Sequence, residues 1–461
     1  MLNKDDPVSV EDFIYSPNTT TLVFDGEAAA ATLLRQNVDK VISRSVESGA
    51  FVVYVNVNDV DRIINAFDYN RNLFPLVLGL LGEAELEASG ILQVQRHPYL
   101  NLRGNGVLLG FVDTGIDYTQ EAFQYEDGSS KIQYIWDQTI RGNPPDGFLY
   151  GSEYDNETIN LALRSENPFD IVPHRDTVGH GTFLASVAGS RESGRYTGAA
   201  PDAEIIVVKL KRATPADYER FLIPRDQENA FSGIDFALGV QYIVDKAREL
   251  NRPVAICVSL GTNLGLHGGF NRLEEYLSVI AETNGKAVCV AAGNEADAGH
   301  HTHGRISVTG SIQNVEVWAS DKFEDIYLTL WNYAIDRMSV SITSPLGEQI
   351  DRVPAYDATG YRRSLILEQS IVIVEYHFPV ERSEGQLTRI KILQATPGIW
   401  TITIYGDSIL DGSYHMWLPL TGFMDFSSPM TFCVTFRSDE RPLYEILSDK
   451  DPEMGFKIMP L

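Results

Sequence analysis

Four apolar runs, separated by helical segments, constrain the fold of this chain more than any other feature. They are "NGVLLGFVDTGIDY" (105–118), "AEIIVVKL" (203–210), "PVAICVSLG" (253–261) and "KAVCVAAGNE" (286–295). Continuous Val, Ile and Leu are typical of strands buried on both faces of a parallel sheet. Amphipathic spacing predicts helices over 235–250 and 274–285, the second ending at Gly285. The sequence therefore predicts an α/β fold, with helices on both faces of a parallel sheet.

The regions on either side of this core have different patterns. Residues 305–422 alternate polar and apolar residues in short runs, which predicts an antiparallel β-sandwich. Residues 1–97 predict a small α/β unit. Its strands are expected at 20–24, 50–57 and 90–95, and its helices at 27–48 and from an N-cap at Asn58. The predicted domains are therefore 1–97, 98–304, 305–422 and an atypical tail over 423–461.

Composition excludes several classes of function. The 461 residues contain 37 Lys and Arg against 63 Asp and Glu, a formal charge of −26. Such a charge repels nucleic acids and anionic membranes, so we expect neither as a partner. No apolar run is long enough to cross a membrane, and the N-terminus lacks the features of a secretion signal. Three cysteines, in apolar or uncharged surroundings, predict reduced thiols rather than a disulfide framework.

Three short motifs predict a catalytic site. They are "DTGID" (113–117), "GHGT" (179–182) and "AAGNE" (291–295), each at a predicted strand end or helix start. Asp113 can accept the Nδ1 proton of His180, whose Nε2 can then take a proton from a hydroxyl nucleophile. Asn294 can donate its side-chain N–H₂ to an oxyanion. An extended peptide can pair with a strand at Ser259, Leu260 and Gly261, so we expect substrate to bind there.

These blocks, in this order, resemble the subtilases, the subtilisin-like serine peptidases of family S8. The segments "LEASGILQVQRHPYLNLRGNGVLLGFVDTGIDY" and "GSYHMWLPLTGF" resemble more narrowly the Csp-type subtilases of spore germination. The resemblance implies a prodomain up to about residue 95 that acts as an intramolecular chaperone or inhibitor, and a jelly-roll β-domain inserted before the serine. It implies no cofactor, a protein substrate such as a germination zymogen, and a cytoplasmic or spore-associated location.

The serine nucleophile that this family requires has no match in the chain. The family motif Gly-Thr-Ser-x-Ala-x-Pro is absent, and Ser427 and Ser428 lack the preceding Gly-Thr. Residues after about 423 also stop resembling the family, which suggests a truncation or a frameshift. We therefore expect the 461-residue chain not to hydrolyse peptides. The alternative is a pseudoprotease that holds a protein partner without cleaving it.

A histidine-rich segment, "GHHTHG" (299–304), offers a competing metal interpretation. Adjacent histidines in a loop rarely converge on one ion without a cysteine or carboxylate partner. We therefore predict a solvated loop near the cleft, and no metal site.

Overall fold

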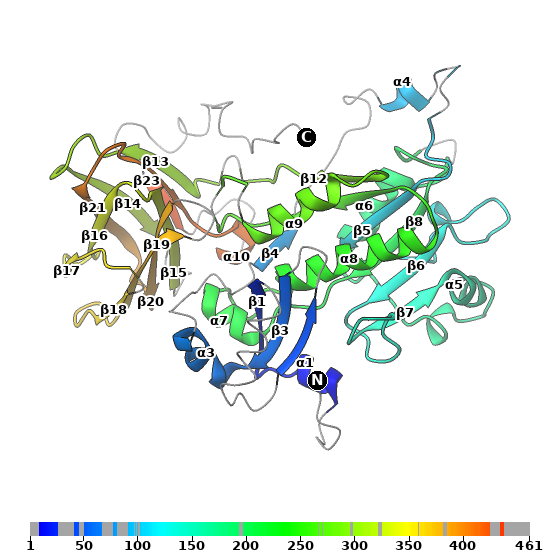
Figure 1. The fold of residues 1–461 in the computed structure, drawn as a ribbon, viewed down its shortest axis with the longest axis horizontal. Coiled ribbons are helices and arrows are strands. Elements are labelled where there is room, and N and C mark those ends of the chain that lie inside the picture. Colours follow the sequence, from blue (N-terminus) through cyan, green and yellow to red (C-terminus); the bar gives the residue numbers. More distant parts are fainter. Residues whose placement is uncertain are drawn as a thin grey trace.

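The computed structural model contains a central mixed sheet, a small N-terminal unit and a C-terminal unit of two antiparallel sheets (Figure 1). The structure describes residues 9–25, 41–45, 50–66, 77–80, 91–95, 97, 99, 102–192, 197–265, 267–269, 271–295, 298–320, 325–357, 359–380, 385–424 and 434–437. Within these ranges, no helix is long and apolar enough to cross a membrane.

The central sheet has the strand order β12-β10-β5-β8-β6-β7. The strands are β5 (Leu108–Asp113), β6 (Ile132–Asp137), β7 (Ser152–Asp155), β8 (Glu204–Lys209), β10 (Val254–Val258) and β12 (Lys286–Val290). All neighbours pair in parallel except β6 and β7, which are antiparallel. The four apolar runs are therefore all strands, and the prediction of a parallel sheet is confirmed. The sequence did not predict β6 and β7, because polar residues interrupt their apolar pattern.

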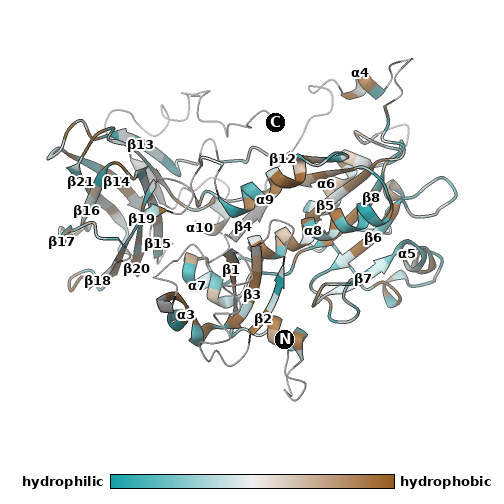
Figure 2. Cartoon of the chain, in the orientation of Figure 1, coloured by the Kyte–Doolittle hydropathy of each residue, from teal (hydrophilic) through white to brown (hydrophobic). Residues whose placement is uncertain are grey.

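Helices cover both faces of this sheet, as predicted. On one face, α8 (Gly233–Glu249) and α9 (Arg272–Ala281) share a core with Val112, Val208 and Ile256. On the other face, α5 (Asn156–Leu163) and α6 (His180–Gly189) share a core with strand residues such as Phe111 and Val207. These two residues adjoin Val112 and Val208 in sequence and therefore point to the opposite face of the sheet. Figure 2 shows hydrophobic and hydrophilic segments along both α8 and α9, as expected for helices with one buried side. Helix α9 ends at Ala281, four residues before the predicted stop.

The N-terminal unit is a three-stranded antiparallel sheet in the order β1-β3-β2. Its elements are α1 (Val10–Ile14), β1 (Thr19–Asp25), β2 (Val41–Ser45), β3 (Ala50–Asn56), η1 (Val57–Asp59), α3 (Val60–Ala66), β4 (Val77–Leu80) and α4 (Ile91–Gln95). Strands β1 and β3 confirm their predictions. The side chain that caps η1 belongs to Asn56, and not to Asn58 as predicted.

Two other predictions for this unit are wrong. Residues 41–45 form strand β2 instead of the end of a helix over 27–48, because they pair with β3 from Val41↔Val55 onward. The rest of that predicted helix, residues 27–40 and 46–48, lies outside the described residues. Residues 91–95 form helix α4 instead of a strand. A short apolar run does not distinguish helix from strand, so the tertiary environment decides.

The C-terminal unit packs two antiparallel sheets around one apolar core that includes Trp400. Their orders are β13-β22-β15-β20-β19-β18 and β17-β16-β21-β14-β23. The strands are β13 (His301–Arg305), β14 (Ile312–Ala319), β15 (Asp325–Tyr333), β16 (Arg337–Thr343), β17 (Gln349–Val353), β18 (Thr359–Ser364), β19 (Ile371–Val380), β20 (Gly385–Leu393), β21 (Gly398–Ser408), β22 (Ser413–Trp417) and β23 (Val434–Arg437). The antiparallel sandwich is confirmed, while its jelly-roll connectivity stays a prediction.

The histidine-rich segment belongs to this sandwich, and its prediction as a loop is wrong. Residues 301–305 form the edge strand β13, in register with β22 from His301↔Trp417 to Arg305↔Ser413. The predicted boundary between residues 304 and 305 therefore falls within the first strand of the sandwich. Backbone pairing with β22, which the local sequence does not reveal, fixes the extended conformation.

The sandwich is joined to the central unit by helix α7 (Pro215–Phe221) and by α10 (Thr421–Met424). Phe221 of α7 and Phe423 of α10 lie in one buried cluster with Tyr327 of β15. The Lys391 ammonium donates to the Arg220 carbonyl oxygen at 2.5 Å. These contacts fix the sandwich beside the loops at one edge of the central sheet.

The N-terminal unit shares its core with the central unit. Val52 and Tyr54 of β3 belong to the same apolar cluster as Trp136 and Phe236. A polar network lies within the central unit beside this shared core. There Asp235 accepts from Tyr150 Oη at 2.6 Å and from Lys211 Nζ at 2.5 Å.

Breaking the buried Lys211–Asp235 pair should destabilise the fold strongly. The side chains are only 8% and 1% exposed, so Lys211→Met leaves an uncompensated carboxylate in the core. We expect a loss of about 3–5 kcal/mol in the free energy of unfolding, measured by urea denaturation. The double variant Lys211→Met/Asp235→Leu should lose less than the single one. A double variant at least as unstable as the single variant would contradict this account.

Candidate active site

The predicted functional blocks meet at one edge of the central sheet. Parallel strands end on the same side, and Asp113 ends β5 while Ser259 follows β10. Asn294 lies on the loop after β12, the next parallel strand. The alignment of the three strands thus brings together residues that are up to 181 positions apart in sequence.

Asp113 and His180 form a hydrogen-bonded pair at this edge. The Nδ1 atom of His180 lies 2.8 Å from Oδ1 and 3.0 Å from Oδ2 of Asp113. The Asp113 side chain is 1% exposed, and that of His180 is 17% exposed. Because Nδ1 faces a carboxylate, its proton is held there, which leaves Nε2 as the basic nitrogen of the ring. The pair has the geometry of a general base with its orienting acid.

Two further donors hold the Asp113 carboxylate. The backbone N–H of Thr114 donates to Oδ1 at 2.7 Å, and the Ser259 hydroxyl donates to Oδ2 at 2.7 Å. The prediction placed Ser259 on a substrate-binding strand. In the structure its side chain contacts the Asp113 carboxylate, while the next two residues, Leu260 and Gly261, form the short strand β11. A buried carboxylate that accepts from several donors is held in one orientation.

Helix α6 begins at His180 because of the residues just before it. Gly179 adopts φ +88°, a left-handed conformation that suits glycine. The carboxylate of Asp176 accepts from the N–H of Gly179 at 2.8 Å and from the N–H and hydroxyl of Thr182 at 2.9 and 2.6 Å. The sequence analysis missed Asp176, although an acidic residue just before a helix start is a recognisable capping signal.

Asn294, the predicted oxyanion donor, lies on the loop after β12 and is exposed. The adjacent Glu295 anchors this loop. Its Oε2 atom is 2.7 Å from His300 Nδ1, and it also accepts from Asn263 Nδ2 and the Thr421 N–H, both at 3.2 Å. Burial raises the pKa of Glu295, but the His300 hydrogen bond and the other donors outweigh it, so the pKa is lowered. Glu295 therefore ties the Asn294 loop to the start of α10.

A strand of the N-terminal unit pairs with the strand that we predicted to bind peptide. β4 pairs antiparallel with β11, with Leu80↔Leu260 and Gly79↔Gly261 in register. On its other side β4 pairs with β9 (Phe231–Ser232). Figure 1 shows β4 between the N-terminal unit and the central sheet. The structure thus places one extended segment between two strands beside Ser259.

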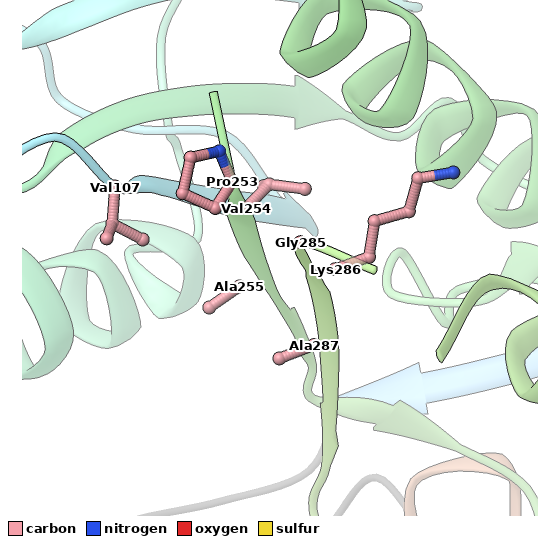
Figure 3. A pocket seen from close by; sticks show the side chains of 7 residues that line it. All are labelled: Val107, Pro253, Val254, Ala255, Gly285, Lys286 and Ala287. Carbon is pink, nitrogen blue, oxygen red and sulfur yellow. The ribbon is translucent and has the colours of Figure 1, made fainter. Parts of the chain in front are cut away.

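One face of the sheet at β10 and β12 is not covered by the described residues. Ala255↔Ala287 and Cys257↔Cys289 are register partners, and Ala287 and Cys289 are exposed. An open hollow of about 270 Å³ begins on this face. Figure 3 shows Ala255 and Ala287 on its neighbouring strands, pointing to the same side. The other lining residues are Val107, Pro253, Val254, Gly285 and Lys286.

The remaining candidates from the sequence are two serines and the histidine-rich segment. Ser427 and Ser428 lie outside the described residues. His301, His303 and His415 stack on one face of β13 and β22, with His301 Nε2 3.0 Å from His415 Nδ1. Across the part of the chain that the structure describes, no group of three or more His, Cys, Asp or Glu side chains is arranged to hold a metal ion.

Comparisons with known proteins place part of the chain near one family. Residues 104–322, which span Asp113, His180 and Asn294, match the model of the subtilase family (Peptidase_S8). This part of the chain is therefore similar to the subtilisin-like serine peptidases.

Two solved structures show what the chain is similar to. One is the CspB protease of Clostridium perfringens, at 29% identity and a TM-score of 0.63 over 72% of this chain and 67% of that one. The other is the epidermin leader peptide processing serine protease EpiP of Staphylococcus aureus, at 14% identity and a TM-score of 0.34 over 60% of each chain. No curated protein matches the chain.

Asp176 should stabilise the start of α6 in a pH-dependent way. Burial raises its pKa, but hydrogen bonds from Thr182 and Gly179 outweigh this effect and lower it. The stabilisation is therefore complete above the unfolded-state pKa of about 3.9 and is lost as pH falls through the lower folded-state value. At pH 7, Asp176→Ala should cost about 1 kcal/mol of unfolding free energy.

Urea denaturation of the wild type and Asp176→Asn at several pH values would test the pH dependence. The wild type should lose more stability than the Asn variant as pH falls below about 4. Parallel curves for the two proteins would contradict this role.

Proposed function

We propose that this chain carries the acid–base pair and peptide-binding cleft of a subtilisin-type serine endopeptidase. The observation that carries the proposal is the pairing of β4 with β11, immediately next to Ser259, whose hydroxyl contacts Asp113. An extended peptide bound in this way gains main-chain hydrogen bonds, which favour affinity without strict dependence on side chains. The subtilase match and the likeness to a protease support the same reaction class.

The residues at the site have defined roles in this reaction. Asp113 keeps the Nδ1 proton on His180 and stabilises the imidazolium that forms when Nε2 takes a proton from a serine hydroxyl. Nε2 then returns that proton to the leaving amine. The Asn294 side chain donates to the oxyanion of the tetrahedral intermediate. Leu260 and Gly261 hold the substrate backbone, and Ser259 orients Asp113.

The 461-residue chain should not complete this reaction, because it contains no Gly-Thr-Ser motif. The apolar face of β10 and β12, which none of the described residues covers, fits this view, since an active site of this class needs a nucleophile-bearing segment next to His180. We place the natural substrate among protein zymogens of spore germination, in a cytoplasmic or spore-associated setting, on the sequence resemblance alone. No cofactor takes part in the proposed mechanism.

The N-terminal unit has a second role in this proposal. It shares a core with the central unit and places β4 in the cleft. A segment that packs in this way can assist folding of the catalytic unit and then block the cleft. This supports its assignment as a prodomain, with processing at a peptide bond that follows β4.

A pseudoprotease that holds a protein partner is the second candidate. The absence of the serine motif from these 461 residues favours it, and the pairing of β4 with β11 supports a site that holds an extended strand without chemistry. In this case the partner would compete with β4 for β11.

A fluorophosphonate probe tests whether the 461-residue chain contains an activated serine. Such probes label only an activated serine, so we expect no labelling of the 461-residue chain, as for its His180→Ala variant. Labelling that depends on His180 would overturn our account of the nucleophile.

Reading the gene beyond the codon for Leu461 in all three frames provides the complementary test. A Gly-Thr-Ser-x-Ala-x-Pro sequence there predicts that the longer product is labelled, and that His180→Ala abolishes the labelling. If no such sequence follows, the binding function gains support over the peptidase.

Backbone pairing between β4 and β11 should protect the Gly261 region from hydrogen exchange. Leu80→Pro removes an N–H and disfavours a paired strand, so deuterium uptake over residues 259–262 should rise. Leu80→Ala keeps the N–H and serves as the matched control, with uptake close to that of the wild type. Equal uptake in all three proteins would show that β4 does not occupy the cleft in solution.

A further inference from the structure

A second His–Asp pair is buried behind the loop that carries Asp113. His174 Nδ1 lies 2.6 Å from Asp137 Oδ2, and the two side chains are 0% and 1% exposed. Asp137 ends β6 just as Asp113 ends β5, and both are in register with Lys209 of β8, the strand between them. The sheet therefore places two carboxylates at one edge, each bonded to a histidine from the 174–180 segment.

The hydrogen bonds of His174 define its tautomer. Its Nε2 atom accepts from the backbone N–H of Ile116 at 3.1 Å, so this nitrogen carries no proton. The ring proton is then on Nδ1 and is donated to Asp137. Burial raises the pKa of Asp137, but the His174 bond and the Thr139 hydroxyl outweigh it, so the pKa is lowered. The pair is a neutral imidazole with an ionised carboxylate, and both ring nitrogens are used.

The His174 ring also packs against the backbone of the Asp113 loop. Gly115 has φ +115°, and a Cβ atom there would lie 2.9 Å from His174 Cε1. On its other side, Gly115 meets the first turn of α6, because a Cβ on Gly181 would lie 2.2 Å from the Gly115 carbonyl oxygen. Gly115 is thus enclosed between His174 and the residue that follows His180.

Two hydrogen bonds extend this contact to α6. The N–H of Gly181 donates to Thr114 Oγ1 at 3.0 Å, and the N–H of Asp117 donates to Thr182 Oγ1 at 2.9 Å. A displacement of the 114–117 loop therefore moves the first turn of α6, and with it the imidazole of His180.

We propose that His174 is a positioning residue, which holds the 113–117 loop through its Ile116 hydrogen bond so that Asp113 and His180 keep their pairing. Asp137 orients His174 for this contact but does not face His180. This inference rests on the proposed function, because His180 matters for catalysis only if the site is that of a peptidase. Its test observes the His180 ring directly and measures no activity. A failure of the His174 proposal can therefore be distinguished from a failure of the proposed function.

The test uses three variants of the 461-residue protein that separate the two bonds of His174. His174→Gln keeps an amide oxygen able to accept from Ile116. His174→Asn keeps an amide donor able to reach Asp137 but loses the Ile116 bond. His174→Leu removes both. Ile159→Ala, which opens a cavity in the neighbouring core cluster, is the control for general destabilisation.

The readout is NMR of protein labelled with ¹⁵N-histidine, in which the His180→Ala spectrum identifies the His180 signals among the nine histidines. We expect the low-field Nδ1–H resonance and the Nδ1–H tautomer of His180 in the wild type, in His174→Gln and in Ile159→Ala. Both should be lost or averaged in His174→Asn and His174→Leu. Unchanged His180 signals in these two folded variants, or equal loss in the Ile159→Ala control, would overturn the proposal.

The wild-type spectrum tests the premise even if the variants do not fold. His174 should show an Nδ1–H tautomer at pH 7, with Nε2 shifted as a hydrogen-bond acceptor. An Nε2–H tautomer, or a doubly protonated ring, would be incompatible with the Ile116 bond and would overturn the proposal.

Discussion

The in-register parallel pairing of β5 with β8 and β10 is the constraint on which the rest of the structure depends. It aligns Asp113 with Lys209 and brings Ser259 beside Asp113, because parallel strands that start in register also end together. A shift of one residue would turn Asp113 to the opposite face of the sheet and separate it from α6. The buried Val, Ile and Leu residues of these strands stabilise this register, since both faces must stay apolar. The same strand register therefore determines both the packing of the core and the position of Asp113.

Contacts from the loops at this edge fix the orientation of the Asp113 and His180 side chains. Asp113 receives donors from His180, Thr114 and Ser259, and so it has little freedom to rotate. Asp176 fixes the start of α6, while His174 supports the loop from behind. Each of these polar groups is buried or partly buried and has its partner, which is the condition under which buried polar networks rigidify a site. The site depends on the whole set of contacts and not on the Asp–His pair alone.

The β4–β11 pairing and the hollow on the sheet lie at opposite ends of β10: β11 follows the end of β10, and the hollow begins at its start. β4 shows how an extended chain can pair with β11, while the small residues of β10 and β12 leave an apolar surface on the same sheet. A complete peptidase of this class would need a hydroxyl nucleophile next to His180. The pairing of β4 with β11 is thus the observation on which the proposed peptide-binding role rests.

The sequence by itself determined the parallel sheet, its flanking helices, the antiparallel sandwich and the pairing of Asp113 with His180. These features follow from local periodicity and from short motifs, whose signals lie within a few residues. Only the tertiary structure decided that 41–45 and 301–305 are strands, that 91–95 is a helix, and that Ser259 contacts Asp113. It also revealed the His174–Asp137 pair, which no local pattern indicates. Each of these depends on a partner distant in sequence, so that backbone pairing and burial, and not local propensity, determine the outcome.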